Sequence, residues 1–248
     1  MPIRLTKAVK VLLIACIAGF VIQQTADQFF GANLQGIFAL IPADFALHFR
    51  FWQIITYAFL HGDVMHLFLN LLMLAFIGGE LEASWGTIRF VRYYFFCSIS
   101  AGLLYLLCQF LFARQGLHTP MIGASGAIYG LLMAYGLIFG ERMLLFMLLF
   151  PMKAKHFVWI LAAIEFLSSV FSGRNGLASV AHLGGMAAGF FYLYGTAYLR
   201  VQKKRRASGT TRSSRKSSKA RKDGHLKLVI NNEFERDRNA KDDPKTWH

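Results

Sequence analysis

The sequence predicts an all-α integral membrane protein, built as a bundle of six transmembrane helices with a long membrane-associated first loop. Of its 248 residues, 55% are hydrophobic and only 16% are charged, whereas a soluble domain carries about 25% charged residues. The apolar residues gather in runs near the roughly 20 residues that one membrane span needs. These runs cover residues 8–25, 63–81, 91–113, 123–140, 156–172 and 179–199.

The first run follows Arg4, Lys7 and Lys10, an arrangement that superficially resembles a signal peptide. No small-residue cleavage site follows it, so we expect a retained first helix. Nearly 40 residues separate this run from the second, and they include Pro42, Asp44 and many Phe residues. This connection is too apolar for a free linker and too broken for a span, which predicts a structure lying against the membrane.

The fourth and fifth runs are short, which favours helices shielded by protein rather than by lipid. Glu165 lies at the centre of the fifth run. An ionisable side chain is costly in lipid and often marks function. Because no partner for Glu165 is evident in the sequence, an inward hydrogen-bonded structural role is the favoured interpretation.

The charge of the chain is concentrated in residues 200–248. This segment holds 16 of the 27 Lys and Arg residues and 6 of the 13 Asp and Glu residues, and so +10 of the net charge of +14. It cannot bury enough apolar surface to fold alone, which predicts a disordered juxtamembrane tail that touches anionic lipid. Nucleic-acid binding is not expected, because the basic stretch lacks interleaved aromatic residues.

The distribution of Lys and Arg also predicts the orientation of the bundle. An even number of spans places both termini on one side, and that side carries eight Lys or Arg residues outside the tail, against three on the other. Positive loops stay in the cytoplasm. We therefore expect a multi-pass protein of a bacterial inner (plasma) membrane with both termini in the cytoplasm, and with the fourth and sixth spans entering from outside.

Ser125 and His182 are poor choices for a membrane span, because hydrocarbon cannot satisfy their polar atoms. Ser125 begins the fourth span and His182 lies in the first turn of the sixth, so both are expected at similar depth in the outer half of the bilayer. A histidine beside a serine is the usual base that makes the hydroxyl nucleophilic. Ser125 also sits near a helix N-terminus, where free N–H groups stabilise developing negative charge.

Other residues of these spans complete the predicted site. His66 and Asn70 are four residues apart on one face of the second span and can donate hydrogen bonds to an oxyanion. Tyr129, one turn beyond Ser125, can pack on the imidazole of His182. Gly123 and Gly126 leave room for a substrate backbone. The pairs Gly126 and Gly130, and Gly185 and Gly189, form small-residue faces for close helix packing.

Three ordered motifs carry a family resemblance: HxxxxHxxxN from His61 to Asn70, GxSGxxxG from Gly123 to Gly130, and AHxxGxxxG from Ala181 to Gly189. Together they resemble the rhomboid family of intramembrane serine proteases over about residues 45–199. The resemblance implies a protease domain over 1–199, followed by the tail, 200–248. It implies hydrolysis of a substrate's transmembrane segment near its outer end, with membrane proteins as substrates and no cofactor.

The resemblance also implies residue roles. Ser125 matches the nucleophile, His182 the general base, His66 and Asn70 the oxyanion-hole side chains, Tyr129 the ring stacked on the base, and His61 a supporting position. One departure lies in the first loop, where Gln53 follows Trp52 and many relatives carry Arg. Gln can keep hydrogen bonds but not ion pairs, so the bracing of that loop is expected to differ.

Other classes of protein fit less well. A zinc intramembrane protease would carry HExxH on a helix, and this motif is absent from the sequence, so no metal is expected. A Ser/Lys dyad fails because Lys153 and Lys155 fall at the cytoplasmic side. A transporter would need paired ionisable residues at mid-membrane, and only Glu165 qualifies. The main alternative is a non-catalytic rhomboid-like protein that binds transmembrane helices for quality control or trafficking. The sequence does not indicate an oligomeric state.

Overall fold

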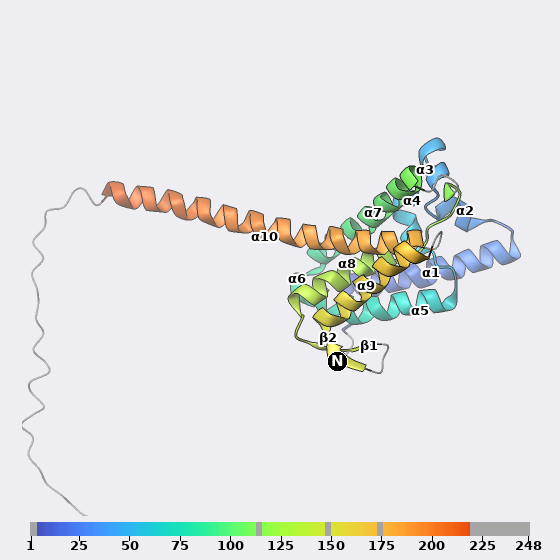
Figure 1. Ribbon diagram of the computed structural model, residues 1–248, viewed down its shortest axis with the longest axis horizontal. Coiled ribbons are helices and arrows are strands. Elements are labelled where there is room, and N and C mark those ends of the chain that lie inside the picture. Colours follow the sequence, from blue (N-terminus) through green and yellow to red (C-terminus); the bar gives the residue numbers. More distant parts are fainter. Residues whose placement is uncertain (1–3, 113–115, 147–149, 173–175, 219–248) are drawn as a thin grey trace, which may run out of the picture. The chain divides into compact units, whose positions relative to one another are not determined.

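The computed structural model describes residues 4–112, 116–146, 150–172 and 176–218 (Figure 1). Their elements are, in chain order, α1 (Lys7–Phe29), α2 (Leu34–Phe38), α3 (Pro42–Leu47), α4 (Gln53–Thr56), the 3-10 turn η1 (Tyr57–Phe59), α5 (Val64–Met73), the π-helical turn η2 (Leu74–Gly78), α6 (Gly79–Trp85), α7 (Thr87–Phe112), α8 (Ser125–Ile138), β1 (Met143–Phe146), β2 (Phe150–Lys153), α9 (Ala154–Phe171) and α10 (Gly176–Ser218).

The described residues confirm the all-α membrane bundle. Five helical stretches are long and apolar enough to span a membrane: Lys7–Phe29, Val64–Trp85, Thr87–Phe112, Ala154–Phe171 and Gly176–Arg206. The sixth is the short apolar helix α8. At about 1.5 Å per residue, its 14 residues reach roughly 21 Å, well short of a bilayer core of about 30 Å. Most of α8 is buried in the bundle, so protein shields it as its length predicts.

The same expectation is wrong for α9. Only Ala154, Phe157, Val158 and Glu165 of this helix are buried, and large apolar side chains such as Trp159 and Phe166 are exposed. Its apolar run is short because Lys153 and Lys155 precede it and Ser172 follows it, rather than because protein surrounds it. Length alone therefore does not separate a shielded helix from a lipid-facing one.

The chain divides into two compact units, Met1–Leu199 and Arg200–His248. α10 continues to Ser218, so residues 200–218 are helical where the sequence predicts disorder. The physical reason is that Lys and Arg, which are frequent in this segment, are good helix formers, and that extending an existing helix requires no new nucleation. Residues 219–248 of the predicted tail lie outside the described residues, and its contact with lipid remains a prediction.

α8 lies in the middle of the first unit, where it packs against α5, α7 and α9 (Figure 1). Its contact with α10 is a seam of glycines. A β-carbon placed on Gly185 would lie 2.0 Å from the carbonyl oxygen of Gly126, and one placed on Gly130 would lie 3.1 Å from that of Gly185. One placed on Gly189 would lie 2.2 Å from the Tyr93 hydroxyl. The predicted small-residue faces therefore meet at backbone distance.

We expect Gly185→Ala to destabilise the bundle, because its β-carbon would overlap the backbone of α8. Overpacking of this kind costs about 1–3 kcal/mol or more. Thermal unfolding in detergent measures the effect. Gly195→Ala on the same helix is the matched control, since a β-carbon there meets nothing within 4 Å. Equal melting temperatures for the two variants would show that the seam is not tight.

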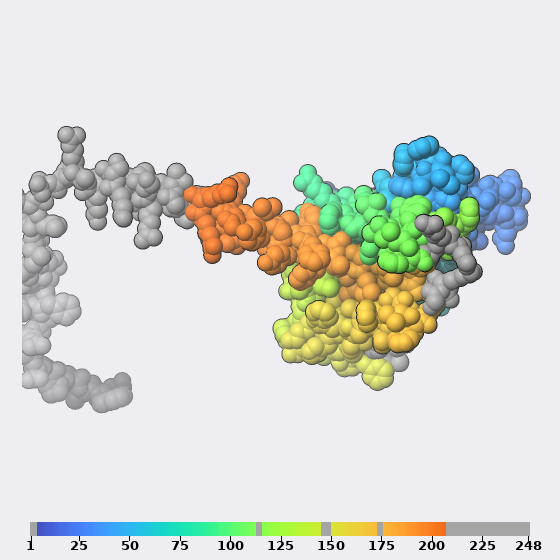
Figure 2. All heavy atoms as spheres, turned by 45° about the horizontal axis from the view of Figure 1, so that its top comes forward, coloured from blue at the N-terminus to red at the C-terminus, as the bar shows by residue number. Residues whose placement is uncertain are grey.

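The first loop packs against the segment that leads into α8. Leu40 and Met121 exchange backbone hydrogen bonds of 3.0 Å, and the N–H of Ala43 donates to Leu117 O at 2.9 Å. Figure 2 shows the two segments side by side, the loop in blue and the segment before α8 in green. The N–H of Gly123 in turn donates to Tyr57 O at 2.9 Å. These bonds fix the chain immediately before Ser125.

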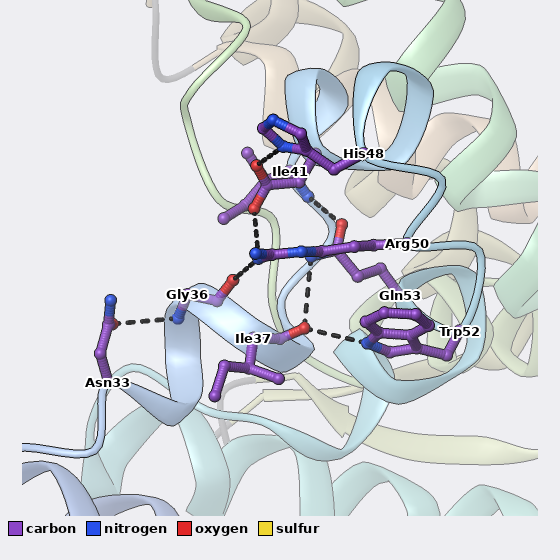
Figure 3. Close-up of polar contacts among 9 residues, drawn as sticks. Asn33, Gly36, Ile37, Ile41, His48, Arg50, Trp52 and Gln53 are labelled. Carbon is purple, nitrogen blue, oxygen red and sulfur yellow. Dashed lines mark hydrogen bonds and ion pairs between the residues drawn. The ribbon is translucent and has the colours of Figure 1, made fainter.

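Gln53 and Arg50 brace the loop internally (Figure 3). Gln53 is fully buried. Its amide accepts from the Ile41 N–H at 3.1 Å and donates to Ile37 O at 3.3 Å. Arg50 donates to Asp44 Oδ2 at 2.8 Å and to Gly36 O at 3.1 Å. Gln53 thus keeps hydrogen bonds as expected, while Arg50, three residues earlier, supplies an ion pair to the loop.

Candidate active site

Ser125 is the first residue of α8 and is half-buried. Gly123, two residues earlier, has φ +112°, a conformation that side-chain-bearing residues rarely adopt. At this turn the chain passes from its hydrogen bond with Tyr57 into the first residues of α8. The backbone N–H groups of the first helical turn have no partner within the helix, so they point toward the region in front of Ser125 with the positive end of the helix dipole.

His182 reaches Ser125 from α10. This helix begins at Gly176, three residues before the predicted start, so His182 lies in its second turn rather than its first. The imidazole Nε2 is 2.7 Å from Ser125 Oγ, a hydrogen-bond distance. The two residues come together because the glycine seam holds α8 and α10 at backbone contact just beyond them. The Nε2 nitrogen of His182 therefore forms a hydrogen bond with the Ser125 hydroxyl.

Tyr129 lies one turn along α8 from Ser125, and its ring stacks on the imidazole of His182. The ring centroids are 4.4 Å apart and the planes differ by 8°. A flat stack of this kind restricts rotation of the imidazole about its side-chain bonds. The aromatic ring therefore holds the histidine in the plane from which Nε2 meets Ser125.

Glu165 of α9 contacts the other nitrogen of His182, and sequence reasoning did not find this pairing. Its Oε1 is 3.0 Å from His182 Nδ1, and it also accepts a hydrogen bond from the Tyr129 hydroxyl. The residue is buried. The sequence signal was present, a carboxylate alone in an apolar run, but its partner depends on how α9 packs against α8 and α10.

His66 and Asn70 lie one turn apart on α5. Asp63 caps this helix by accepting from the His66 N–H at 2.8 Å. A β-carbon placed on Gly123 would lie 2.7 Å from His66 Nε2 and 3.7 Å from Ser125 Oγ, so the space that the glycine leaves open faces both side chains. Asn70 is buried, and its amide donates to His66 O at 3.0 Å.

His61 is fully buried, and its ring packs edge-on against that of His66 with centroids 5.2 Å apart. Gln23 of α1 fixes its backbone, bonding the His61 N–H at 3.3 Å and the His61 carbonyl at 3.2 Å. Burial, with His66 as a second cause, lowers the pKa of His61 to about 4. The ring is therefore neutral near pH 7 and packs beside His66 without charge repulsion.

Gly126 has a different environment from the one predicted. The sequence interpretation has it open for a substrate backbone, but a β-carbon there would lie 2.6 Å from the β-carbon of Ala101 on α7. Its carbonyl meets Gly185 of α10. Gly126 is needed because three helices converge at this point. Gly123 is likewise a position of close approach, but its neighbours there are the site side chains His66 and Ser125.

Comparison with known proteins assigns the chain to a family. Residues 48–199 match the Rhomboid domain. The chain is 33% identical to RHOMBOID-like protein 4 of Arabidopsis thaliana over 149 residues, which is 56% of this chain and 32% of that protein. It is 33% identical to the mitochondrial Rhomboid protein 1 of Saccharomyces cerevisiae over 141 residues, 56% of this chain and 40% of that protein.

A third relative is RHOMBOID-like protein 1 of Arabidopsis thaliana, 32% identical over 142 residues, which cover 56% of this chain and 33% of that protein. The matched part of this chain thus spans only about a third to two fifths of these relatives. The family match covers more than half of the chain, includes every residue of the Ser125–His182 site and agrees with an all-α membrane bundle. The chain therefore belongs to the rhomboid family of integral membrane proteins.

Proposed function

We propose that this protein is an intramembrane serine endopeptidase with Ser125 as nucleophile and His182 as general base. The observation that supports the proposal most directly is the 2.7 Å contact between His182 Nε2 and Ser125 Oγ at the N-terminus of α8. A nucleophile within hydrogen-bond reach of an oriented base is the signature of covalent hydrolysis. The stacked ring of Tyr129 orients that base.

In the first half-reaction, His182 Nε2 takes the proton of the Ser125 hydroxyl while Oγ attacks the carbonyl carbon of a substrate peptide bond. The carbonyl oxygen becomes an oxyanion, for which the Ser125 N–H, His66 and Asn70 are the donors. His66 and Ser125 both face the side of Gly123 on which a β-carbon would stand, and this oxygen would form between them. His182 then gives its proton to the leaving amine, which departs as the C–N bond breaks.

In the second half-reaction, a water molecule enters the place of the departed amine and hydrolyses the acyl-enzyme. His182 accepts a proton from the water, the resulting hydroxide attacks the acyl carbon, and the ester bond to Ser125 breaks. His182 returns the proton to Oγ, which restores the enzyme and releases a carboxylic acid. The proton that leaves the water therefore ends on Ser125, and each half-reaction begins from a neutral dyad.

The substrates we propose are membrane proteins with a transmembrane helix, cut near its outer end. A helical carbonyl is shielded by its own backbone hydrogen bond, so the segment must unwind first, and Gly or Ser near the cut eases this step. The Lys and Arg bias supports a topology with both termini in the cytoplasm. In that topology the N-terminal end of α8 opens to the outside, from which water enters.

A fluorophosphonate probe tests the nucleophile without knowledge of the substrate. Attack by Ser125 Oγ on phosphorus expels fluoride and leaves a covalent label. We expect labelling of the wild type and none of Ser125→Ala, with Ser84→Ala, an exposed serine on α6, as the matched control that stays labelled. A wild type that binds transmembrane helices but takes no label would support a non-catalytic role instead.

A further inference from the structure

Glu165 is a carboxylate buried in a membrane-spanning helix, and such a group needs partners. Only 8% of the residue is exposed. Three neighbours meet its carboxylate: His182 Nδ1 at 3.0 Å, the hydroxyl of Tyr129, and the side chain of Ser179. All three come from α8 and α10, the two helices of the candidate active site. Of these three, only the imidazole can carry the opposite charge.

The carboxylate and the serine lie against opposite nitrogens of one ring. His182 Nε2 meets Ser125 and Nδ1 meets Glu165. The Glu165 contact has the distance of an ion pair but not the alignment of a linear hydrogen bond. Catalytic hydrogen bonds are often poorly aligned before the substrate binds. In the described arrangement the carboxylate therefore acts on the ring mainly through its charge.

We propose that Glu165 is a positioning residue for His182 and that it turns the dyad into a Ser125–His182–Glu165 triad. This inference rests on the proposed serine protease function and adds a third group to it. A negative charge beside Nδ1 favours the tautomer that carries its proton there, which leaves the lone pair of Nε2 free to accept the Ser125 proton. The same charge stabilises the imidazolium that forms once that proton has moved.

Tyr129 couples the carboxylate to the ring. It stacks on the imidazole and donates its hydroxyl to Glu165. With Ser179 as a further donor, two neutral groups hold the carboxylate in place. Because Tyr129 and Ser179 belong to α8 and α10, Glu165 also ties α9 to those helices. If Glu165 had only a structural role, its carboxylate would stabilise the helix bundle without affecting the tautomer or the basicity of His182.

The kinetics of cleavage by Glu165→Gln and the tautomer of His182 separate these roles. The Gln amide keeps the size of the side chain and the capacity to accept from Tyr129 but removes the charge. We expect kcat to fall by about 10-fold to 1,000-fold with little change in KM, less than the roughly 10⁴-fold loss at a well-aligned triad acid.

Three variants sharpen the interpretation. Glu165→Asp keeps the charge and should restore part of the lost kcat. Tyr129→Phe keeps the stacked ring and removes only the hydroxyl, so its loss of kcat should be smaller than that of Glu165→Gln. Glu141→Gln is the matched control, because Glu141 is an exposed carboxylate paired with Lys153 and Lys155. It should leave both kcat and KM unchanged.

A second measurement needs no substitution at Glu165. In ¹⁵N-histidine-labelled protein, the nitrogen shifts of His182, assigned through His182→Gln, should show the proton on Nδ1 in the neutral state. A proton on Nε2 would overturn the inference, as would a Glu165→Gln protein with the wild-type kcat and KM. If Ser125→Ala cleaves as the wild type does, the proposed function fails. If that variant is inactive and Glu165→Gln is unaffected, only the triad fails.

Discussion

Ser125→Ala is expected to abolish cleavage of a membrane-embedded substrate, with a fall in rate of at least about 10⁴-fold. The substitution removes the oxygen that lies 2.7 Å from His182 Nε2 and leaves no nucleophile at that position. His182→Ala should lose activity to a similar extent, since an un-ionised serine hydroxyl is a weak nucleophile without a base. Cleavage of a transmembrane substrate reconstituted in liposomes measures both.

The double variant makes this test sharper. Residues that act as one unit give non-additive losses, so removing both should cost about as much as removing either alone. Thermal unfolding in detergent is the folding control, because Ser125 is half-buried and Ala fits its place at the start of α8. Cleavage by Ser125→Ala at the wild-type rate, with the bundle intact, would rule out the proposed nucleophile.

The fold and the candidate dyad were accessible from sequence because both depend on local patterns. Apolar run length identified the spans, and the order of those spans placed Ser125 and His182 at one end of the bundle. Tyr129 followed from helical periodicity, since a residue four positions beyond Ser125 lies on the same face. These inferences need only the geometry of a single helix and the alternation of direction between successive spans.

What the sequence could not provide depends on how helices rotate and approach one another. The pairing of Glu165 with His182 requires the angular position of α9, which its run length does not specify. Gly126 was assigned to substrate access because a small residue beside a nucleophile suggests space, whereas α7 fills that space with Ala101. In the first loop, Arg50 provides the ion pair that the residue after Trp52 does not.

Residues 200–218 show a different limit of prediction from sequence, which concerns disorder. Composition predicts that residues 200–218 cannot fold alone, but these residues continue α10 rather than starting a fold of their own. Disorder predictions consider a segment in isolation, while a helix that enters the segment removes the cost of nucleation. The boundary between the two compact units at Leu199 therefore falls inside one helix.

Gly123→Ala is expected to impair the proposed cleavage strongly, although position 123 carries no side chain. Its φ of +112° is strained for any residue with a β-carbon, at a cost of about 1–3 kcal/mol. The new β-carbon would also lie 2.7 Å from His66 Nε2 and 2.8 Å from Cε1. It would occupy the space between His66 and Ser125 where the oxyanion is proposed to form.

The expected result is a loss of cleavage of at least about 100-fold, the effect of removing an oxyanion donor, accompanied by slower fluorophosphonate labelling. Labelling should slow because the phosphonyl oxygen needs the same space as the oxyanion. Gly62→Ala is the matched control: it lies near the same histidine, but its β-carbon would meet Ile122 at 3.7 Å and His66 Nδ1 at 3.9 Å, which are ordinary contacts. A Gly123→Ala protein that labels and cleaves like Gly62→Ala would place the scissile carbonyl elsewhere and would remove His66 from the proposed mechanism.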